Sequence, residues 1–385
     1  MQTNLLFIEN LELDFFNPRS IICFIAILQG AIFAVLLFSR FFKHQSKADL
    51  WLGGLLGVLC LSLVTPFIGF ANVYDRNQWL TYFPFSIAYS YGVCVWFYTL
   101  NLTDSKREFQ AKDLFLFLPT LVYLAYRFFL FAHSLEWKAW FGENYGDFFG
   151  TFIFITETIW NIVFLYFAVR HYRKYRVWLN ENYSDTEKIK FDWLRNFLYI
   201  FTAVLIFGAL FDFTNSFLFK LSYIQYFYFE LVLACVTYYL AIAGYLRSKT
   251  IELQFSEKQA EEAERKMLLT EKELQSLKNK LQGLMQNEKL YLEPNLTLTD
   301  LSKNLGVNSS ILSYVINNGF GKNFNDFINE FRIEEVKNKL KTANDSTLLG
   351  IAFDCGFNSK ATFNRAFKKF TGFSPKEFQE NSGQN

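Results

Sequence analysis

The sequence predicts an all-α protein with a seven-helix transmembrane bundle, a helical coiled-coil linker and a C-terminal domain of two helix-turn-helix units. Three observations lead to this prediction. Long apolar blocks fill residues 1–246, heptad-spaced side chains follow over 247–289, and a repeat of about 50 residues occupies 290–385. We therefore expect three domains with these boundaries.

The composition places the chain among membrane proteins. It has 385 residues, 52% of them hydrophobic and 20% aromatic, which is well above a soluble protein. The net charge of +2 says little about partners. The cysteines have no metal-ligand spacing, so we expect small buried residues and no metal site: Cys23, Cys60, Cys94, Cys235 and Cys355.

Seven apolar segments are long enough to span a bilayer. A spanning helix needs about 20 apolar residues, because it rises 1.5 Å per residue across about 30 Å of hydrocarbon. A very large soluble core is the alternative, but seven such runs make it improbable. The predicted spans are 20–39, 50–70, 79–101, 113–133, 148–169, 196–218 and 223–246.

Basic residues predict the orientation of the bundle, because they stay on the cytoplasmic side. The odd-numbered connections hold thirteen: Arg40, Lys43, Lys47, Lys106, Arg107, Lys112, Arg170, Arg173, Lys174, Arg176, Lys188, Lys190 and Arg195. The other side holds four: Arg19, Arg76, Lys138 and Lys220. The N-terminus should thus lie outside and the C-terminus in the cytoplasm.

Four ionisable residues fall inside the predicted spans: Arg127, Glu157, Asp212 and Glu230. Charge at membrane depth is costly and usually faces the bundle interior. The predicted topology places these residues in the outer half or near the midplane, around one outward-facing cavity, with Trp160, Asn161 and Asn215 nearby. They form either a ligand-sensing pocket or a structural set of ion pairs. Three acidic residues against one arginine would suit a cationic or polyhydroxyl ligand.

The linker carries two apolar positions at heptad spacing, which is typical of a two-stranded coiled coil. One position holds Ala260, Met267, Leu274 and Leu281, and the other holds Ala263, Thr270, Leu277 and Leu284. The pattern predicts a homodimer through residues 260–284. A single solvated helix is the alternative, since Ala and Thr weaken the first half.

The C-terminal repeat aligns LSKNLGVNSSILSYVI from Leu301 with IAFDCGFNSKATFNRAF from Ile351. Each copy reads as a short helix, a Gly for a left-handed turn, an Asn cap and a second helix. In the second helices, Leu312, Val315, Phe363 and Phe367 should face inward. A connecting helix over 324–341 would span about 26 Å and hold the two units about one DNA turn, roughly 34 Å, apart.

The chain resembles the AraC/XylS family of transcription regulators over about Leu296 to Phe378. The second unit carries the resemblance through Gly356, Phe357, Phe363, Phe367, Gly372 and Pro375. Attachment to a multi-span domain resembles a membrane-anchored subset of that family. The resemblance implies double-stranded DNA as the partner, recognition helices in successive major grooves, and a multi-pass protein of the bacterial inner membrane with a cytoplasmic C-terminal domain.

The resemblance also implies which side chains meet DNA. In the first unit they are Ser310, Ser313 and Tyr314, and in the second Lys360, Ala361, Asn364 and Arg365. Arg365 could read guanine and Asn364 adenine, while Lys368 and Lys369 would meet phosphates.

The charge of the terminal domain is unusual for a DNA-binding protein. Residues 290–385 hold eleven Lys or Arg against ten Asp or Glu, and the first recognition helix has no basic residue. A monomer should thus bind weakly, and pairing of two copies would raise the effective concentration. The alternative is a fold retained without DNA binding.

Two other functional classes are compatible with a membrane domain followed by a helical linker. A sensor kinase is excluded because the histidines, His44, His133 and His171, lie outside the linker and no Gly-rich phosphate loop follows. We therefore expect no enzyme, no catalytic residue and no cofactor. The sequence thus predicts a regulator that senses a small molecule or the envelope state. The remaining alternative is a receptor or transporter-like protein that signals through a protein partner.

Overall fold

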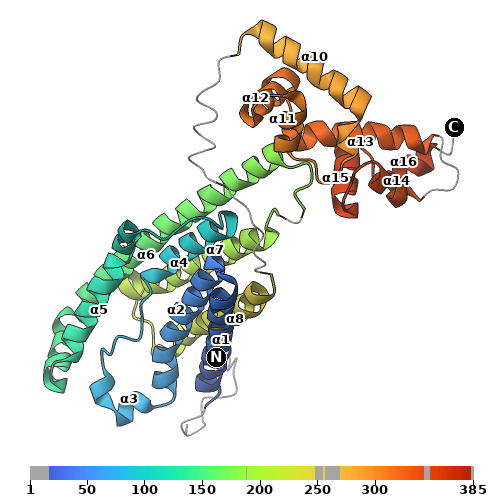
Figure 1. The fold of residues 1–385 in the computed structure, drawn as a ribbon. Helices are drawn as coiled ribbons and strands as arrows, with labels where there is room; N and C mark the ends of the chain where they lie inside the picture. The colour runs from blue at the N-terminus through green and yellow to red at the C-terminus, as the bar shows by residue number, and fades with distance from the viewer. Residues whose placement is uncertain (1–16, 188, 248–254, 256–268, 342–346, 383–385) are drawn as a thin grey trace. The chain divides into compact units, whose positions relative to one another are not determined.

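The computed structural model describes residues 17–187, 189–247, 255, 269–341 and 347–382 (Figure 1). Over these residues the regular structure is helical, with one isolated bridge between Tyr183 and Thr297. The all-α prediction is therefore confirmed for the part of the chain that is described. The chain forms two compact units: residues 1–172 with 192–254, and residues 173–191 with 255–385.

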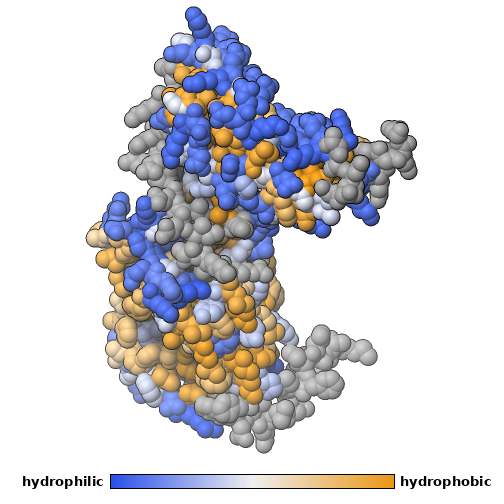
Figure 2. Space-filling view, turned by 45° about the vertical axis from the view of Figure 1, so that its right-hand side comes forward, coloured by the Kyte–Doolittle hydropathy of each residue, from blue (hydrophilic) through white to orange (hydrophobic). Residues whose placement is uncertain are grey.

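The first unit holds the apolar helices. Among the described residues, six helical segments have the length and composition to cross a membrane, and they coincide with six of the seven predicted spans. Hydrophobic side chains cover much of this unit's surface in Figure 2. Its elements are α1 (Pro18–His44), α2 (Lys47–Phe70), α3 (Val73–Arg76), η1 (Gln78–Leu80), α4 (Ser90–Thr103), η2 (Ala111–Phe117), α5 (Leu118–Phe131), α6 (Leu135–Asn182, which ends in the second unit), α7 (Asp192–Phe213), η3 (Thr214–Leu218) and α8 (Tyr223–Arg247).

The third predicted span, 79–101, is not a helix of membrane length, so the count of seven is not confirmed. The α-helix here is Ser90–Thr103, 14 residues that rise about 21 Å. Pro84 disfavours helix at the residue before it, and Tyr82 has a φ of 67°. Most of α4 is buried, which explains why its sequence is as apolar as a span.

Helices α1 and α2 pack closely through small residues and one ion pair. A Cβ at Gly30 would lie 2.5 Å from Cys60 Sγ and 3.0 Å from Thr237 Cγ2, so only glycine allows this approach to α2 and α8. Arg40 Nε donates a hydrogen bond to Asp49 Oδ2 at 2.6 Å. These contacts fix the first helical hairpin of the unit.

The second unit contains two helix-turn-helix units joined by one long helix. Hydrophilic side chains dominate its surface in Figure 2. The connecting helix α13 (Phe324–Leu340) lies where the sequence predicts it. The other elements are α10 (Glu271–Glu288), η4 (Leu290–Leu292), α11 (Leu298–Leu305), α12 (Ser309–Tyr314), η5 (Val315–Gly319), α14 (Leu348–Asp354), α15 (Lys360–Thr371) and α16 (Pro375–Ser382).

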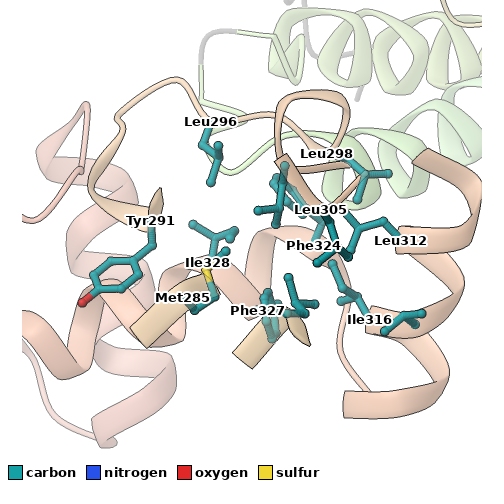
Figure 3. Packing of buried hydrophobic residues seen from close by; sticks show 13 residues of the cluster. Met285, Tyr291, Leu296, Leu298, Leu305, Leu312, Ile316, Phe324, Phe327 and Ile328 are labelled. Atoms are coloured by element: carbon teal, nitrogen blue, oxygen red, sulfur yellow. The ribbon is translucent and has the colours of Figure 1, made fainter. Parts of the chain in front are cut away.

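Helix α10, which the sequence assigns to the linker, packs into the core of the first helix-turn-helix unit. Leu281 and Met285 are fully buried in a cluster with Leu312, Ile316 and Phe324. Figure 3 shows Met285 beside Ile328, and Leu312 with Phe324 and Ile316 further along the same core. Three more leucines of the predicted seam, Leu274, Leu277 and Leu284, pack against the same cluster. The seam positions Ala260, Ala263 and Met267 lie outside the described residues, so the coiled coil stays a prediction.

Candidate nucleic-acid interface and acidic cavity

Helix α15 presents one polar face and one buried face. Ser359 accepts a hydrogen bond from Thr362 N at 3.1 Å and caps the helix, while Phe363 and Phe367 are buried as expected from the sequence. The predicted contact residues of this helix all lie on its exposed face: Lys360, Ala361, Asn364, Arg365, Lys368 and Lys369. The local fold therefore presents them together.

Two of these cations already have partners. Arg365 Nη1 lies 3.2 Å from Glu187 Oε2, and Lys369 Nζ lies 2.6 Å from Asp326 Oδ1 on α13. The side chains of Lys360 and Lys368 make no hydrogen bond or ion pair to other described residues. The free positive charge on this face is accordingly smaller than the residue count implies.

Helix α12 of the first helix-turn-helix unit is short and uncharged. Ser310, Ser313 and Tyr314 are half-buried, whereas Leu312 and Val315 are fully buried as predicted. The helix passes directly into the π-helical turn η5. Its polar side chains are hydroxyl groups, so α12 itself brings no positive charge toward a duplex.

Glycines shape both turns as the sequence predicts, but the caps differ. Gly306 and Gly356 have φ values of 72° and 90°. Asn308 caps α12 by accepting from Ser310 N at 2.8 Å. In the second copy Ser359 is the cap, and Asn358 instead donates to Pro294 O at 2.8 Å. Asn358 therefore ties the second turn to the segment that precedes the first unit.

Arg332 of α13 is fully buried at the centre of the unit and was missed by the sequence analysis. Its Nε donates to Tyr291 O and its Nη2 to Glu293 O, both at 2.7 Å. Burial lowers the pKa of Arg332 to about 10, and the charge of Asp185 opposes this shift. The guanidinium thus satisfies carbonyls that no helix hydrogen bond reaches.

Residues 183–191 connect α6 and α7 in the chain. They lie against the C-terminal helix-turn-helix domain. Ser184 is buried, and its hydroxyl donates to Leu296 O at 2.7 Å. Asn325 Nδ2 donates to Ser184 O at 2.8 Å. Sequence reasoning gave no role to this segment, because nothing in its composition distinguishes it from a solvated loop.

The four ionisable residues predicted inside the spans converge on one cavity in the first unit. The cavity has a volume of about 420 Å³ and lies among α2, α4, α5, α6, α7 and α8. Arg127, Glu157, Asp212 and Glu230 all line it, and each is half-buried. Ser86 and Ala88 from the non-helical stretch before α4 also line it, which fits irregular backbone lining a cavity.

These charges do not neutralise one another. Among the described residues no ion pair joins Arg127 to any of the three carboxylates. Arg127 Nη2 instead donates to Phe83 O at 3.3 Å, and its Nε is buried with no partner in the described part of the chain. Asp212 accepts from the Tyr226 hydroxyl at 3.2 Å.

The neighbours expected around this cavity are partly found. Asn161 lines it and also accepts a hydrogen bond from Gly92 N at 2.7 Å. Asn215 lies elsewhere and accepts from Leu221 N, and Trp160 packs against Phe164. The helical spacing therefore identified the charged residues better than the neutral ones.

The cysteines are free thiols in this structure. Four are buried and Cys235 is exposed. Burial raises the pKa of the Cys355 thiol to about 11. Within the described ranges, no group of three or more His, Cys, Asp or Glu residues could hold a metal ion.

Comparisons with known proteins match the C-terminal region. A family model described as a helix-turn-helix domain matches residues 301–381. An HTH-type transcriptional regulator of Staphylococcus aureus (strain COL) is 39% identical over 90 residues, covering 23% of this chain and 12% of that protein. The transcriptional regulatory protein YesN of Bacillus subtilis (strain 168) is 30% identical over 92 residues, covering 23% and 25%.

The chain therefore spans only about an eighth to a quarter of the length of these curated relatives. No solved structure matches it. The fold and the matches define the C-terminal region as a helix-turn-helix domain of the kind found in transcription regulators, a class that is not enzymatic. More particularly, residues 301–381 carry a helix-turn-helix domain of the AraC type.

Proposed function

We propose that the protein is a membrane-bound one-component transcription regulator. Its C-terminal domain binds double-stranded DNA sequence-specifically in the cytoplasm, and its apolar helices anchor it in the bacterial inner membrane with the N-terminus outside. The observation that carries this proposal is the exposed polar face of α15 in a domain of the AraC type. The six apolar helices and the bias of basic residues support the membrane anchor.

Within this proposal α15 supplies most of the DNA recognition. Arg365 reads guanine through two hydrogen bonds, and Asn364 reads adenine. Lys360 and Ala361 lie at the start of the same face, and Lys368 and Lys369 neutralise phosphates. Ser310, Ser313 and Tyr314 of the first helix-turn-helix unit contribute contacts without charge.

The acidic cavity is the proposed sensor site for a small molecule or envelope signal. Three carboxylates and one guanidinium line about 420 Å³ without pairing among themselves, which favours a ligand over a set of structural ion pairs. The excess of acidic over basic side chains favours a cationic or polyhydroxyl compound.

Dimerisation through residues 260–284 remains part of the proposal. The described leucines of that seam already pack into the core of the helix-turn-helix domain. Pairing of two chains would therefore depend mainly on the seam positions before Thr270.

The full chain in lipid nanodiscs provides the test. A duplex is first selected from a random-sequence library with the wild-type protein, and its affinity is then measured by fluorescence anisotropy at fixed salt. Arg365→Ala should weaken binding by about tenfold or more, from the 1–3 kcal/mol of a bidentate base contact.

The same variant discriminates the alternative, a receptor or transporter-like protein that signals through a protein partner. In that case one of two results is expected. The wild-type chain selects no duplex, or it selects one but the response of a reporter gene does not follow DNA affinity across Lys360→Ala and Arg365→Ala. Either result would exclude direct DNA recognition by α15.

A further inference from the structure

The segment 183–191 is held on the DNA-binding domain by its backbone. Ser184 N donates to Leu296 O at 3.3 Å, and Ser184 O accepts from Asn325 Nδ2 at 2.8 Å and from Asn329 Nδ2 at 3.3 Å. Arg332 Nη2 adds a hydrogen bond to the Ser184 hydroxyl at 3.2 Å. Such main-chain contacts with buried partners fix the position of the segment.

The acidic side chains of the segment point at the recognition helix. Thr362 Oγ1 donates to Asp185 Oδ1 at 3.0 Å, and Arg365 Nη1 donates to Glu187 Oε2 at 3.2 Å. Burial works to raise the pKa of Glu187, but the hydrogen bond and charge of Lys190, together with Arg365, hold that pKa below its ordinary value. Glu187 is therefore ionised at neutral pH and pairs with Arg365 as a carboxylate.

A bound duplex would compete with this arrangement for the donors of Arg365. A guanidinium that reads guanine must direct its donors at the base edge in the major groove, whereas here a donor of Arg365 is directed at Glu187. A duplex on the same face would also bring phosphates toward two carboxylates, and like charges repel in that setting.

We propose that the segment 183–191 is an internal competitor of duplex DNA for the recognition face of α15. The proposal rests on the proposed function, because it requires that α15 reads DNA. The occupant of the surface is a stretch of the same chain whose carboxylates take the place of the negatively charged DNA.

The position of the segment in the chain gives the competition a route of control. It connects α6, which carries Glu157, with α7, which carries Asp212, and both of these residues line the acidic cavity. A ligand that changes the separation of α6 and α7 changes the strain on the segment between them. Release of the segment then frees Arg365 for DNA.

The first test compares duplex affinities of full-length chains in nanodiscs, with the duplex selected as above. Glu187→Gln removes the charge opposite Arg365 and should tighten binding about threefold, the range expected for one partly exposed ion pair. The double variant Asp185→Asn with Glu187→Gln should tighten it further. Glu108→Gln is the matched control, since Glu108 is exposed and makes no hydrogen bond or ion pair to other described residues.

The second test follows the segment itself by hydrogen exchange and mass spectrometry in the wild-type chain. Saturating duplex should speed exchange across 183–191, because the bond from Ser184 N to Leu296 O is lost when the segment leaves. Unaltered exchange with duplex bound would show that segment and DNA occupy the domain together.

The outcomes separate this inference from the proposed function. If the wild-type chain binds the duplex and Arg365→Ala does not, but Glu187→Gln binds like wild type and exchange is unchanged, only the competition is overturned. If neither the wild-type chain nor Glu187→Gln retains any duplex, both proposals fail. Tighter binding by Glu187→Gln but not by Glu108→Gln supports the competition.

Discussion

Arg332 and Ser184 stand 148 positions apart in the sequence and meet in the core of the DNA-binding unit, where Arg332 Nη2 donates to Ser184 Oγ at 3.2 Å. The same guanidinium donates to Tyr291 O and Glu293 O. One fully buried cation therefore joins the connecting helix α13, the turn before the first helix-turn-helix unit and the segment 183–191.

Replacement of this cation should destabilise the unit. Arg332→Met leaves the buried Tyr291 O without its side-chain donor and removes one donor each from Glu293 O and the Ser184 hydroxyl. An orphaned buried group costs about 1–3 kcal/mol. We expect a loss of about 3 kcal/mol in protection from hydrogen exchange across α11 to α16 of the full chain. Ser184→Ala is the control: it removes one hydroxyl, which accepts from Arg332 and donates to Leu296 O, and should cost about 1 kcal/mol. Equal effects of the two variants would contradict a central role for Arg332.

The two turn glycines should respond differently to alanine. A Cβ at Gly306 meets no atom within 4 Å, so Gly306→Ala costs only the left-handed backbone, about 1–2 kcal/mol. A Cβ at Gly356 would lie 2.7 Å from both Tyr291 O and Leu292 O. Gly356→Ala should therefore cost about 3 kcal/mol or more. Hydrogen exchange of α14 and α15 checks the order, and a smaller loss in Gly356→Ala would refute the close approach.

The sequence allowed the elements of the fold to be predicted where a local pattern determines them. Apolar runs, the repeat at Leu301 and Ile351, and the spacing of Phe363 and Phe367 are local signals. The third span failed because α4 is apolar for a different reason, namely burial within its own unit. Hydropathy alone does not distinguish a helix in lipid from a helix in a protein core.

The candidate sites likewise differ in whether a local sequence signal identifies them. Charges inside apolar spans are rare enough to be noticed, so Arg127, Glu157, Asp212 and Glu230 could be grouped in advance. The pairing of Glu187 with Arg365 could not be, because it depends on a tertiary contact across 178 positions. Heptad spacing also does not say which surface a seam meets. The sequence assigns Leu281 to a dimer seam, whereas in the structure it packs into the core of the first helix-turn-helix unit.

Glu335 should make the stability of the DNA-binding unit depend on pH. Burial works to raise the pKa of Glu335, but hydrogen bonds from Lys289 and Tyr291 hold it below the ordinary 4.5. A carboxyl with a lowered folded pKa stabilises the fold above its unfolded pKa, and this stability is lost as the pH falls through the folded pKa. Glu335→Gln should thus lower stability by about 1 kcal/mol at pH 7, and this loss should shrink as the pH falls below the ordinary 4.5.

Calorimetry of the full chain in nanodiscs measures this as a melting temperature lower by about 2–4 °C at pH 7. Glu334→Gln is the control, because its carboxylate is more exposed and pairs with Lys337 in the neighbouring turn. A pH-independent difference between Glu335→Gln and wild type would show that the Glu335 ion pair with Lys289 is not the cause.

Arg365 and Lys368 should differ in how they affect DNA recognition. Arg365→Lys keeps the charge but loses the two-pronged geometry, so it should relax specificity at one base pair by about 1–3 kcal/mol. Lys368→Ala should weaken all duplexes alike and reduce the slope of log affinity against log salt by about 1. Anisotropy over a salt series with single-base variants of the selected duplex separates the two effects. The reverse assignment would place Lys368 at a base edge.

The acidic cavity should bind its ligand through the carboxylates of α6 and α8. A screen of organic cations and polyols against the full chain, read as a rise in melting temperature, should find compounds that stabilise the wild type. Glu157→Gln or Glu230→Gln should weaken such a compound by about tenfold, since a charge-assisted hydrogen bond contributes about 1.5–3 kcal/mol. Asp147→Asn is the matched control, because Asp147 pairs with Lys220 in the same unit and does not line the cavity. Anionic compounds that bind equally well to wild type and Glu157→Gln would point to Arg127 as the principal contact and reverse the expected ligand charge.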